Sequence, residues 1–142
     1  MNVKSDCASL FSLISSVLSA SDGVRFMRDP TRGGVSSTLN ELTAESEFGL
    51  LVKENSLPIP DEIRGACELL GFDPLFLANE GKVIMIVDDR ESEVILEVMK
   101  SHPLGKESCI IGEVIDDPAG KVVMETSIGS RRILDMQVGE QL

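Results

Sequence analysis

The chain has 142 residues, of which 42% are hydrophobic, and it contains neither Trp nor Tyr. This length and composition predict one domain with an aliphatic core and give no reason to expect disorder. The formal net charge of −11 argues against general nucleic-acid binding, which depends on clustered Lys and Arg.

Cysteine usage and hydropathy suggest where the protein works. Cys7, Cys67 and Cys109 are odd in number and widely spaced, which argues against a disulfide framework or a zinc site and favours a reducing compartment. No stretch has the pattern of a signal peptide, and the longest apolar run, residues 83–87, is far too short to cross a bilayer. We therefore expect a soluble, cytoplasmic protein.

Two amphipathic helices are expected in the first third of the chain. Apolar residues at helical spacing predict a helix over residues 6–20, with Ser5 as its cap. A glycine-containing loop, residues 27–34, follows a short segment at residues 24–27. After this loop, apolar residues at i, i+4 and i+7 predict a second helix to about residue 45.

A strand and a third helix are expected next. Residues 48–53 are apolar and bounded by turn residues, which is typical of a strand. A helix should then begin after Pro60 and end at Gly71, a residue suited to helix termination. Cys67 lies on the apolar stripe of that helix, so we expect it to be structural rather than reactive.

A polar pair precedes the most hydrophobic strand of the chain. A short helical turn over residues 75–78 leads to Asn79 and Glu80, and residues 82–88 then form a strand with five consecutive apolar residues. We expect both faces of this strand to be buried in mid-sheet. Function often sits at the mouth of such a strand, although the spacing alone favours an exposed turn for Asn79 and Glu80.

The last third of the chain should contain a helix and a hairpin. Asp88 or Asp89 can cap a fourth helix that buries its apolar residues, which are Val94, Ile95, Val98 and Met99. Residues 109–115 and 121–125 are interpreted as an antiparallel pair, followed by an irregular arm over residues 126–142. Cys109 should pack as a small apolar residue.

The single histidine, His102, precedes a Pro-Leu-Gly sequence. The sequence around it offers no Ser or Cys placed as a catalytic partner, so a loop or packing role is favoured over catalysis. Taken together, helices alternating with short strands predict an α/β (α+β) fold. We expect a layered domain with a central mixed sheet flanked by helices, not the all-parallel sheet of a doubly wound fold.

The loop Met27-Arg-Asp-Pro-Thr-Arg-Gly-Gly34 is the strongest local signal of function. Asp29 or Thr31 can cap the following helix, and Gly33 and Gly34 leave the backbone accessible at its start. With Arg32 and two further arginines nearby, the loop is suited to bind a phosphate or carboxylate. An ordinary turn and helix cap would use the same residue types, so this alternative stays open.

Several motifs together resemble the hydrogenase maturation protein HypE family. They are the loop at residues 27–34, Leu75-Phe-Leu-Ala-Asn-Glu-Gly-Lys82, His102-Pro-Leu-Gly105, Ile111-Gly112, and the stretch from Gly129 to Leu142; the opening Ser5-Asp-Cys-Ala8 also matches. The resemblance covers almost the whole chain but only the C-terminal half of the family's proteins. It implies a fold like the C-terminal domain of aminoimidazole ribonucleotide synthetase, partly ferredoxin-like in topology.

The resemblance also implies a chemistry. HypE proteins receive a carbamoyl group on a C-terminal cysteine from HypF and dehydrate it with ATP to a thiocyanate. With HypC and HypD they pass the cyanide to the iron of [NiFe] hydrogenase. ATP and magnesium are held mainly by an N-terminal domain. By this resemblance Glu80 and Asn79 are the catalytic pair, and the residues lining the nucleotide side are Asp29, Thr31, Arg32, Gly33 and Gly34; no metal ligand is assigned.

Two departures from the family limit the expected activity. The N-terminal ATP-binding domain is missing from residues 1–142, and the family's ending, Gly-Glu-Gln-Leu-Pro-Arg-Ile-Cys, stops here at Leu142. We therefore expect a single domain that binds no cofactor alone, is inactive alone, and is a monomer or weak homodimer. The alternatives are a non-catalytic binding or regulatory domain, and the equivalent half of another ATP-dependent enzyme such as selenophosphate synthetase.

Overall fold

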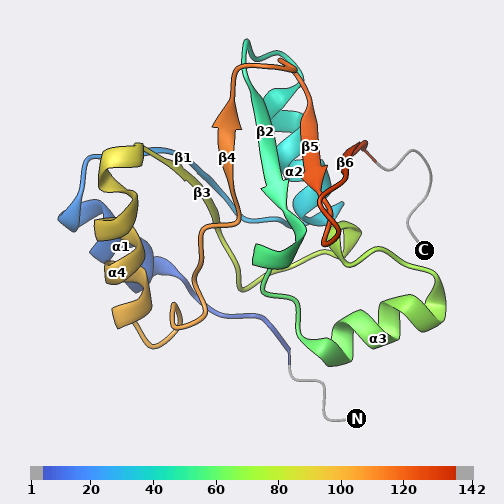
Figure 1. The fold of residues 1–142 in the computed structure, drawn as a ribbon. Coiled ribbons are helices and arrows are strands. Elements are labelled where there is room, and N and C mark those ends of the chain that lie inside the picture. The colour runs from blue at the N-terminus through green and yellow to red at the C-terminus, as the bar shows by residue number, and fades with distance from the viewer. Residues whose placement is uncertain (1–4, 137–142) are drawn as a thin grey trace. The chain divides into compact units, whose positions relative to one another are not determined.

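The computed structural model describes residues 5–136 of the chain (Figure 1). The backbone forms two compact units, each made from two separate stretches of sequence. The first unit comprises the residues up to Pro30 together with Asn79–Cys109, and the second comprises Thr31–Ala78 and the residues from Ile110 onward.

The first unit packs two helices against a two-stranded sheet. Its elements in chain order are α1 (Phe11–Ala20), β1 (Val24–Arg28), β3 (Ile84–Val87) and α4 (Ser92–Ser101). Strands β1 and β3 are antiparallel, and α1 lies beside α4 (Figure 1). The core of this unit consists of the buried Leu13, Val17 and Ile95, against which Met85 and Val87 pack. Side chains alternate along a strand, so Met85 and Val87 face the helices. Ile84 and Ile86 lie on the other face of β3.

Two expectations for this unit are wrong. The first helix begins at Phe11 and not at residue 6, because Asp6 instead accepts a hydrogen bond from the backbone N–H of Glu80. The hydrophobic strand is not in mid-sheet: β3 has β1 as its sole partner among the described residues, and all four of its residues are half-buried. Strand β1 itself was not predicted, since an irregularity between Val24 and Phe26 breaks its alternation.

The predicted cap of α4 is confirmed, whereas the prediction of its buried face is only partly right. Asp88 accepts the backbone N–H of Arg90 at 3.1 Å and so caps a short 3-10 turn, Asp89–Glu91, that leads into the helix. Ile95 is fully buried, and Val98 and Met99 pack against the core as expected. Val94 is 46% exposed, contrary to the prediction, because it lies to the side of the stripe that contacts the core.

The second unit contains the mixed sheet expected from the sequence. Its strands are β2 (Gly49–Lys53), β4 (Gly112–Ile115), β5 (Val122–Glu125) and β6 (Arg131–Ile133), in the order β4-β2-β5-β6. Strand β2 is antiparallel to β4 and parallel to β5. Helix α2 (Gly34–Thr43) packs on β2 and β5, as Figure 1 shows. The α/β class with helices on a mixed sheet is therefore confirmed, although the strands of the chain are divided between two sheets.

The predicted hairpin of residues 109–115 and 121–125 is wrong. Strand β2 lies between β4 and β5, so the two segments do not pair with each other. The physical reason is that residues 49–52 of β2 are all buried, and a strand that is apolar on both faces takes the central position. The connection between β4 and β5 passes from one edge of β2 to the other.

Helix α3 (Asp61–Leu70) ends where the sequence predicts. Gly71 has φ +72°, the N–H of Phe72 donates to the carbonyl of Cys67, and the N–H of Gly71 donates to that of Glu68. This is a Schellman arrangement, which requires the left-handed conformation that glycine adopts without strain. Cys67 is buried as expected. Cys109 is exposed, contrary to expectation, because it lies ahead of β4 and in no strand.

The stretch after β5 is more regular than expected. A turn closed by Thr126 and Ser130 leads into β6, which is antiparallel to β5. Leu134 then packs in the core, 1% exposed, and its N–H donates to the carbonyl of Val122. The remainder of the predicted arm, residues 137–142, lies outside the described residues.

Candidate functional site

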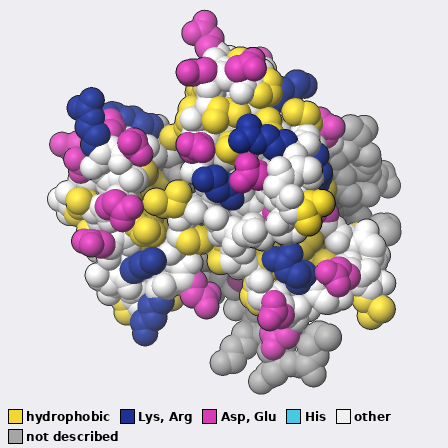
Figure 2. Space-filling model, viewed as in Figure 1, with side chains coloured by type: hydrophobic (Ala, Val, Ile, Leu, Met, Phe, Trp, Pro, Cys, Tyr) yellow, Lys and Arg dark blue, Asp and Glu magenta, His cyan; other side chains and the backbone are white. Residues whose placement is uncertain are grey.

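The loop at residues 27–34 runs from the end of β1 to the start of α2. Asp29 and Arg32 are exposed, Thr31 is half-buried, and Pro30 is fully buried. The surface view in Figure 2 shows acidic and basic side chains interspersed on the face toward the viewer. The exposed Asp29 and Arg32 bring one charge of each sign to this loop.

The cap of α2 differs from the expected one. Gly33 occupies the cap position with φ +81°, and no side chain hydrogen-bonds there, so the prediction that Asp29 or Thr31 caps the helix is wrong. The loop closes instead through its backbone, because the carbonyl of Thr31 accepts the N–H of Gly34 at 2.9 Å. Because Gly33 occupies the cap position, neither Asp29 nor Thr31 stands where a side chain usually caps a helix.

Packing explains why residue 34 is a glycine. Gly34 has φ +64°, and a Cβ there would lie 2.5 Å from the carbonyl oxygens of both Leu75 and Leu77. Gly33 and Gly34 are both buried, so the expectation that they leave the backbone accessible is wrong, because the backbone of Leu75 and Leu77 packs against Gly34. The absent side chain of Gly34 thus makes space for the 3-10 turn Pro74–Phe76 and the residues after it, within the second unit.

Asn79 and Glu80 lie in the first unit, next to Pro30 of the loop. The N–H of Asn79 donates to the carbonyl of Pro30 at 2.9 Å. The ammonium group of Lys82 donates to Oδ1 of Asn79 at 2.6 Å, and Oδ2 of Asp6 accepts the N–H of Glu80 at 3.3 Å. Asn79 is half-buried and Glu80 is exposed, so the Glu80 carboxylate is accessible to a substrate.

Asp6 and Lys82 are neighbours of this pair that the sequence did not single out. They form an ion pair of 3.9 Å with each other. The sequence placed Asp6 in the first turn of a helix, and 74 residues separate it from Glu80. Gly81 was the available signal, because a glycine ahead of a strand often marks the close approach of another backbone.

The structure gives His102 a partner but not a catalytic arrangement. Its Nε2 lies 2.9 Å from Oγ of Ser12 on α1, and its Nδ1 accepts the backbone N–H of Leu104 at 3.1 Å. A neutral imidazole that accepts at Nδ1 carries its proton on Nε2, so His102 donates to Ser12. It cannot then act as the base that activates this hydroxyl. The expected loop role of His102 agrees with this geometry.

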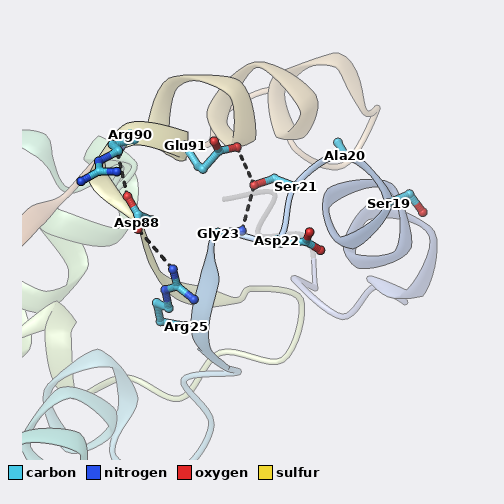
Figure 3. A pocket seen from close by; sticks show the side chains of 9 residues that line it. All are labelled: Ser19, Ala20, Ser21, Asp22, Gly23, Arg25, Asp88, Arg90 and Glu91. Carbon is cyan, nitrogen blue, oxygen red and sulfur yellow. Dashed lines mark hydrogen bonds and ion pairs between the residues drawn. The ribbon is translucent and has the colours of Figure 1, made fainter.

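One cavity of about 470 Å³ lies in the first unit (Figure 3). Its lining residues are Ser19, Ala20, Ser21, Asp22, Gly23, Arg25, Asp88, Arg90 and Glu91. Ser21 donates to Glu91 at 2.9 Å, and Arg25 donates to Asp88 at 3.2 Å, as the dashed lines show. The backbone N–H of Arg90 and then the Arg25 guanidinium lower the pKa of Asp88. These charged groups pair with each other and connect the start of β1 to the start of α4.

Two properties of residues 5–136 bear on the class of site. No cluster of three or more His, Cys, Asp or Glu side chains in this range could hold a metal ion. Within the same range, every helix is too short or too polar to cross a membrane.

The comparisons with known proteins give the family. Residues 3–125 match the family described as AIR synthase related protein, C-terminal domain. The chain, with its mixed sheet and flanking helices, belongs to this family of domains.

The most informative relatives are hydrogenase maturation proteins. The chain is 44% identical over 141 residues to the carbamoyl dehydratase HypE of Rhodobacter capsulatus, covering 99% of this chain and 42% of that protein. It superposes on HypE in a crystal structure of a HypE–HypF complex with a TM-score of 0.90 and 41% identity, covering 96% of this chain and 44% of the other. For HypE in complex with ATP the TM-score is 0.91 at 38% identity, with 97% and 43% covered. The chain thus corresponds to the C-terminal part of HypE and spans less than half the length of these relatives.

Proposed function

We propose that this chain is the C-terminal, substrate-side part of a HypE-type carbamoyl dehydratase. The observation that carries the proposal is the 44% identity to the R. capsulatus carbamoyl dehydratase over 99% of the chain. The proposed reaction converts an S-carbamoyl cysteine to a thiocyanate with ATP, as a step in making the cyanide ligands of [NiFe] hydrogenase.

The proposed chemistry requires an activated oxygen and a base. The carbamoyl oxygen first forms a bond to the terminal phosphorus of ATP while the bond from that phosphorus to the bridging oxygen breaks and ADP leaves. The phosphorylated oxygen is then a good leaving group. The carbon–oxygen bond then breaks with release of phosphate, while the nitrogen loses two protons and the carbon–nitrogen triple bond forms. A carboxylate next to the nitrogen can accept a proton in this step, and such general-base assistance contributes about 10²–10⁴-fold.

Glu80 is the carboxylate that we assign to this role. Glu80 is exposed, and its backbone N–H is held by the side chain of Asp6. The preceding residue, Asn79, is held by hydrogen bonds to Pro30 and Lys82. Asn79 is proposed to hydrogen-bond the carbamoyl group. These contacts support a carboxylate presented on a fixed backbone, which is what a general base needs.

The loop from Asp29 to Gly34 is proposed to contact the phosphates of the nucleotide. Helix α2 begins at Gly34 without a side-chain cap, and Arg32 is exposed, so both features fit an anion. Thr31 and Gly33 would contribute backbone and hydroxyl contacts, and Asp29 is the one carboxylate of the loop. We assign magnesium to the N-terminal domain of a HypE-type protein, as the resemblance to that family implies.

The remaining parts of the proposal concern the assembly. A HypE–HypF crystal structure supports HypF as a partner, and we propose that HypF supplies the carbamoyl group. We extend the partner set to HypC and HypD, and we place the protein in the cytoplasm. Residues 1–142 are proposed to fold as one domain, and to be a monomer or weak homodimer that cleaves no ATP alone.

The test is turnover with and without the rest of a HypE protein. In a chimera this chain replaces the matching C-terminal part of the R. capsulatus relative, and a Pro-Arg-Ile-Cys tail is added after Leu142. The cysteine of that tail is carbamoylated. ATP cleavage and the loss of one water from the modified tail, followed by mass spectrometry, should occur in the chimera and be abolished by Glu80→Gln. The chain alone should cleave no ATP. A chimera that binds ATP but never dehydrates its tail would instead favour a non-catalytic binding domain.

A further inference from the structure

The segment Ser5–Ala8 lies directly against the catalytic pair proposed above. A Cβ placed on Gly81 would collide with the carbonyl oxygen of Asp6 and come within 3.2 Å of the backbone nitrogen of Ala8. Residue 81 must therefore be glycine for this segment to approach. The contact explains the Gly that follows Asn79 and Glu80 without invoking a ligand.

Asp6 makes two polar contacts across this interface. Its Oδ2 accepts the backbone N–H of Glu80 at 3.3 Å and lies 3.9 Å from the ammonium group of Lys82. The ammonium group in turn donates to Oδ1 of Asn79 at 2.6 Å. A single carboxylate thus joins the backbone of Glu80 to the side chain of Asn79 through Lys82. All of these groups belong to the first unit.

The Lys82 contact also orients the Asn79 amide. An ammonium group can only donate, so the atom of the amide that faces it must be the oxygen. The NH₂ end of Asn79 then points away from Lys82 as a donor. Without Lys82 the two ends of the amide would be nearly equivalent in shape, and half of the amide orientations would present an acceptor where a carbamoyl oxygen needs a donor.

We propose that Asp6 and Lys82 are positioning residues for the reaction, a role that rests on the proposed function of Glu80 and Asn79. Asp6 fixes the backbone at Glu80, and Lys82 fixes the orientation of Asn79. Neither residue touches the reacting atoms. A misplacement of about 1 Å at a reacting group can cost about 10²-fold in rate, so loss of this support reduces turnover although the carboxylate of Glu80 remains.

The first arm of the test reads the contact itself. Hydrogen–deuterium exchange of the backbone amide of Glu80 is measured in the 142-residue chain. Loss of the Asp6 acceptor in Asp6→Ala should speed this exchange by about two- to tenfold. Asp6→Asn keeps an acceptor oxygen and should leave it near the wild-type rate. Asp22→Ala removes an exposed aspartate elsewhere in the same unit and serves as the matched control.

The second arm reads the reaction in the carbamoylated chimera. Asp6→Ala and Lys82→Met should each lower the dehydration rate by about tenfold or more with the KM for ATP unchanged, because the nucleotide contacts are assigned to other residues. Asp6→Asn should retain most of the rate, and Asp22→Ala all of it. A purely structural role would instead lower the amount of folded protein and leave the rate per folded molecule unchanged.

The outcomes separate the two proposals. The positioning role is wrong if Asp6→Ala leaves the exchange rate of the Glu80 amide unchanged, or if it changes that rate without lowering the rate of dehydration. In either case loss of the reaction in Glu80→Gln would still support the proposed function. Full dehydration by Glu80→Gln overturns the catalytic assignment of Glu80 and, with it, the reason for positioning that residue. Faster exchange together with a lower rate and rescue by asparagine supports the inference.

Discussion

The side-chain amide of Asn40 donates a hydrogen bond of 2.8 Å to the carbonyl oxygen of Leu134, 94 residues further along the chain. Oγ of Ser36, one turn earlier on α2, donates to the carbonyl of Asp135 at 3.0 Å. The helix therefore binds the backbone that follows β6 with two polar side chains. This leaves Leu134 fixed in the core of the second unit, where its side chain is 1% exposed.

Substitution of Asn40 should destabilise the chain. Asn40→Ala leaves the partly buried carbonyl of Leu134 without this donor, so we expect a loss of about 1–3 kcal/mol in the free energy of unfolding. Urea denaturation measures it. Asn55→Ala, at an exposed position, should change the free energy by less than about 0.5 kcal/mol. Equal effects of the two substitutions would contradict the importance of the Leu134 contact.

Two glycines should respond in opposite directions to alanine. Gly34→Ala places a side chain at φ +64° against two carbonyl oxygens, which should cost more than about 2 kcal/mol. Gly65 lies inside α3, and a methyl group added to it would have no atom within 4 Å apart from its chain neighbours and the backbone of its own helix, so Gly65→Ala should stabilise by about 0.5–1 kcal/mol. Thermal unfolding of both variants gives the comparison. Similar melting temperatures for the two would show that Gly34 is not constrained as described.

Acid should remove one contribution to stability that Asp88 makes. The pKa of Asp88 is lower in the folded chain than its ordinary value, because the N–H of Arg90 and the Arg25 side chain favour the charged carboxylate. Such a group stabilises the folded state above its ordinary pKa, and the contribution is lost as the pH falls through the folded pKa.

The corresponding experiment compares wild type with Asp88→Asn. Wild type should be the more stable at neutral pH, and the difference in urea midpoint should shrink as the pH falls below about 4. Asp22→Asn is the control variant, because Asp22 is an exposed aspartate that lines the same cavity. A difference for Asp88→Asn that is independent of pH would rule out its carboxylate charge as the cause.

The three thiols should react with an alkylating reagent in a defined order. Cys7 is exposed and should react first, whereas Cys67 is buried and should react only when the chain unfolds. Partial burial of the thiol raises the pKa of the otherwise exposed Cys109, an effect that the charge of Lys100 partly opposes. Less of it is therefore thiolate at neutral pH, and its reaction should accelerate more as the pH is raised. Peptide mapping after timed labelling would reveal any other order.

Local signals in the sequence predicted local structure well. Gly71 ends α3 in the conformation expected of it, and Cys67 is buried on the stripe where its spacing placed it. These features depend on residues within one or two helical turns. The same is true of the cap at Asp88, which accepts a backbone N–H two residues away.

Pairings between distant residues could not be predicted in this way. The apolar run before Asp88 indicated a strand but not that β1 would be its partner, because nothing within the run specifies which other segment fits its edge. The insertion of β2 between β4 and β5 replaced a plausible hairpin for the same reason. At the candidate site, Glu80 and Asn79 were found by resemblance, whereas Asp6 and Lys82 became visible once the backbone of Ser5–Ala8 was seen against Gly81.

The parallel pairing of β2 with β5 has a consequence for how the chain reaches its folded state. Leu50 lies opposite Val122, so the central strand pairs with a segment far downstream in the sequence. Folds dominated by such distant pairings form slowly, because loop closure precedes the contacts that stabilise it. During synthesis the apolar residues Leu50, Leu51 and Val52 emerge long before β5 exists. During that interval the unpaired apolar strand is most exposed to aggregation.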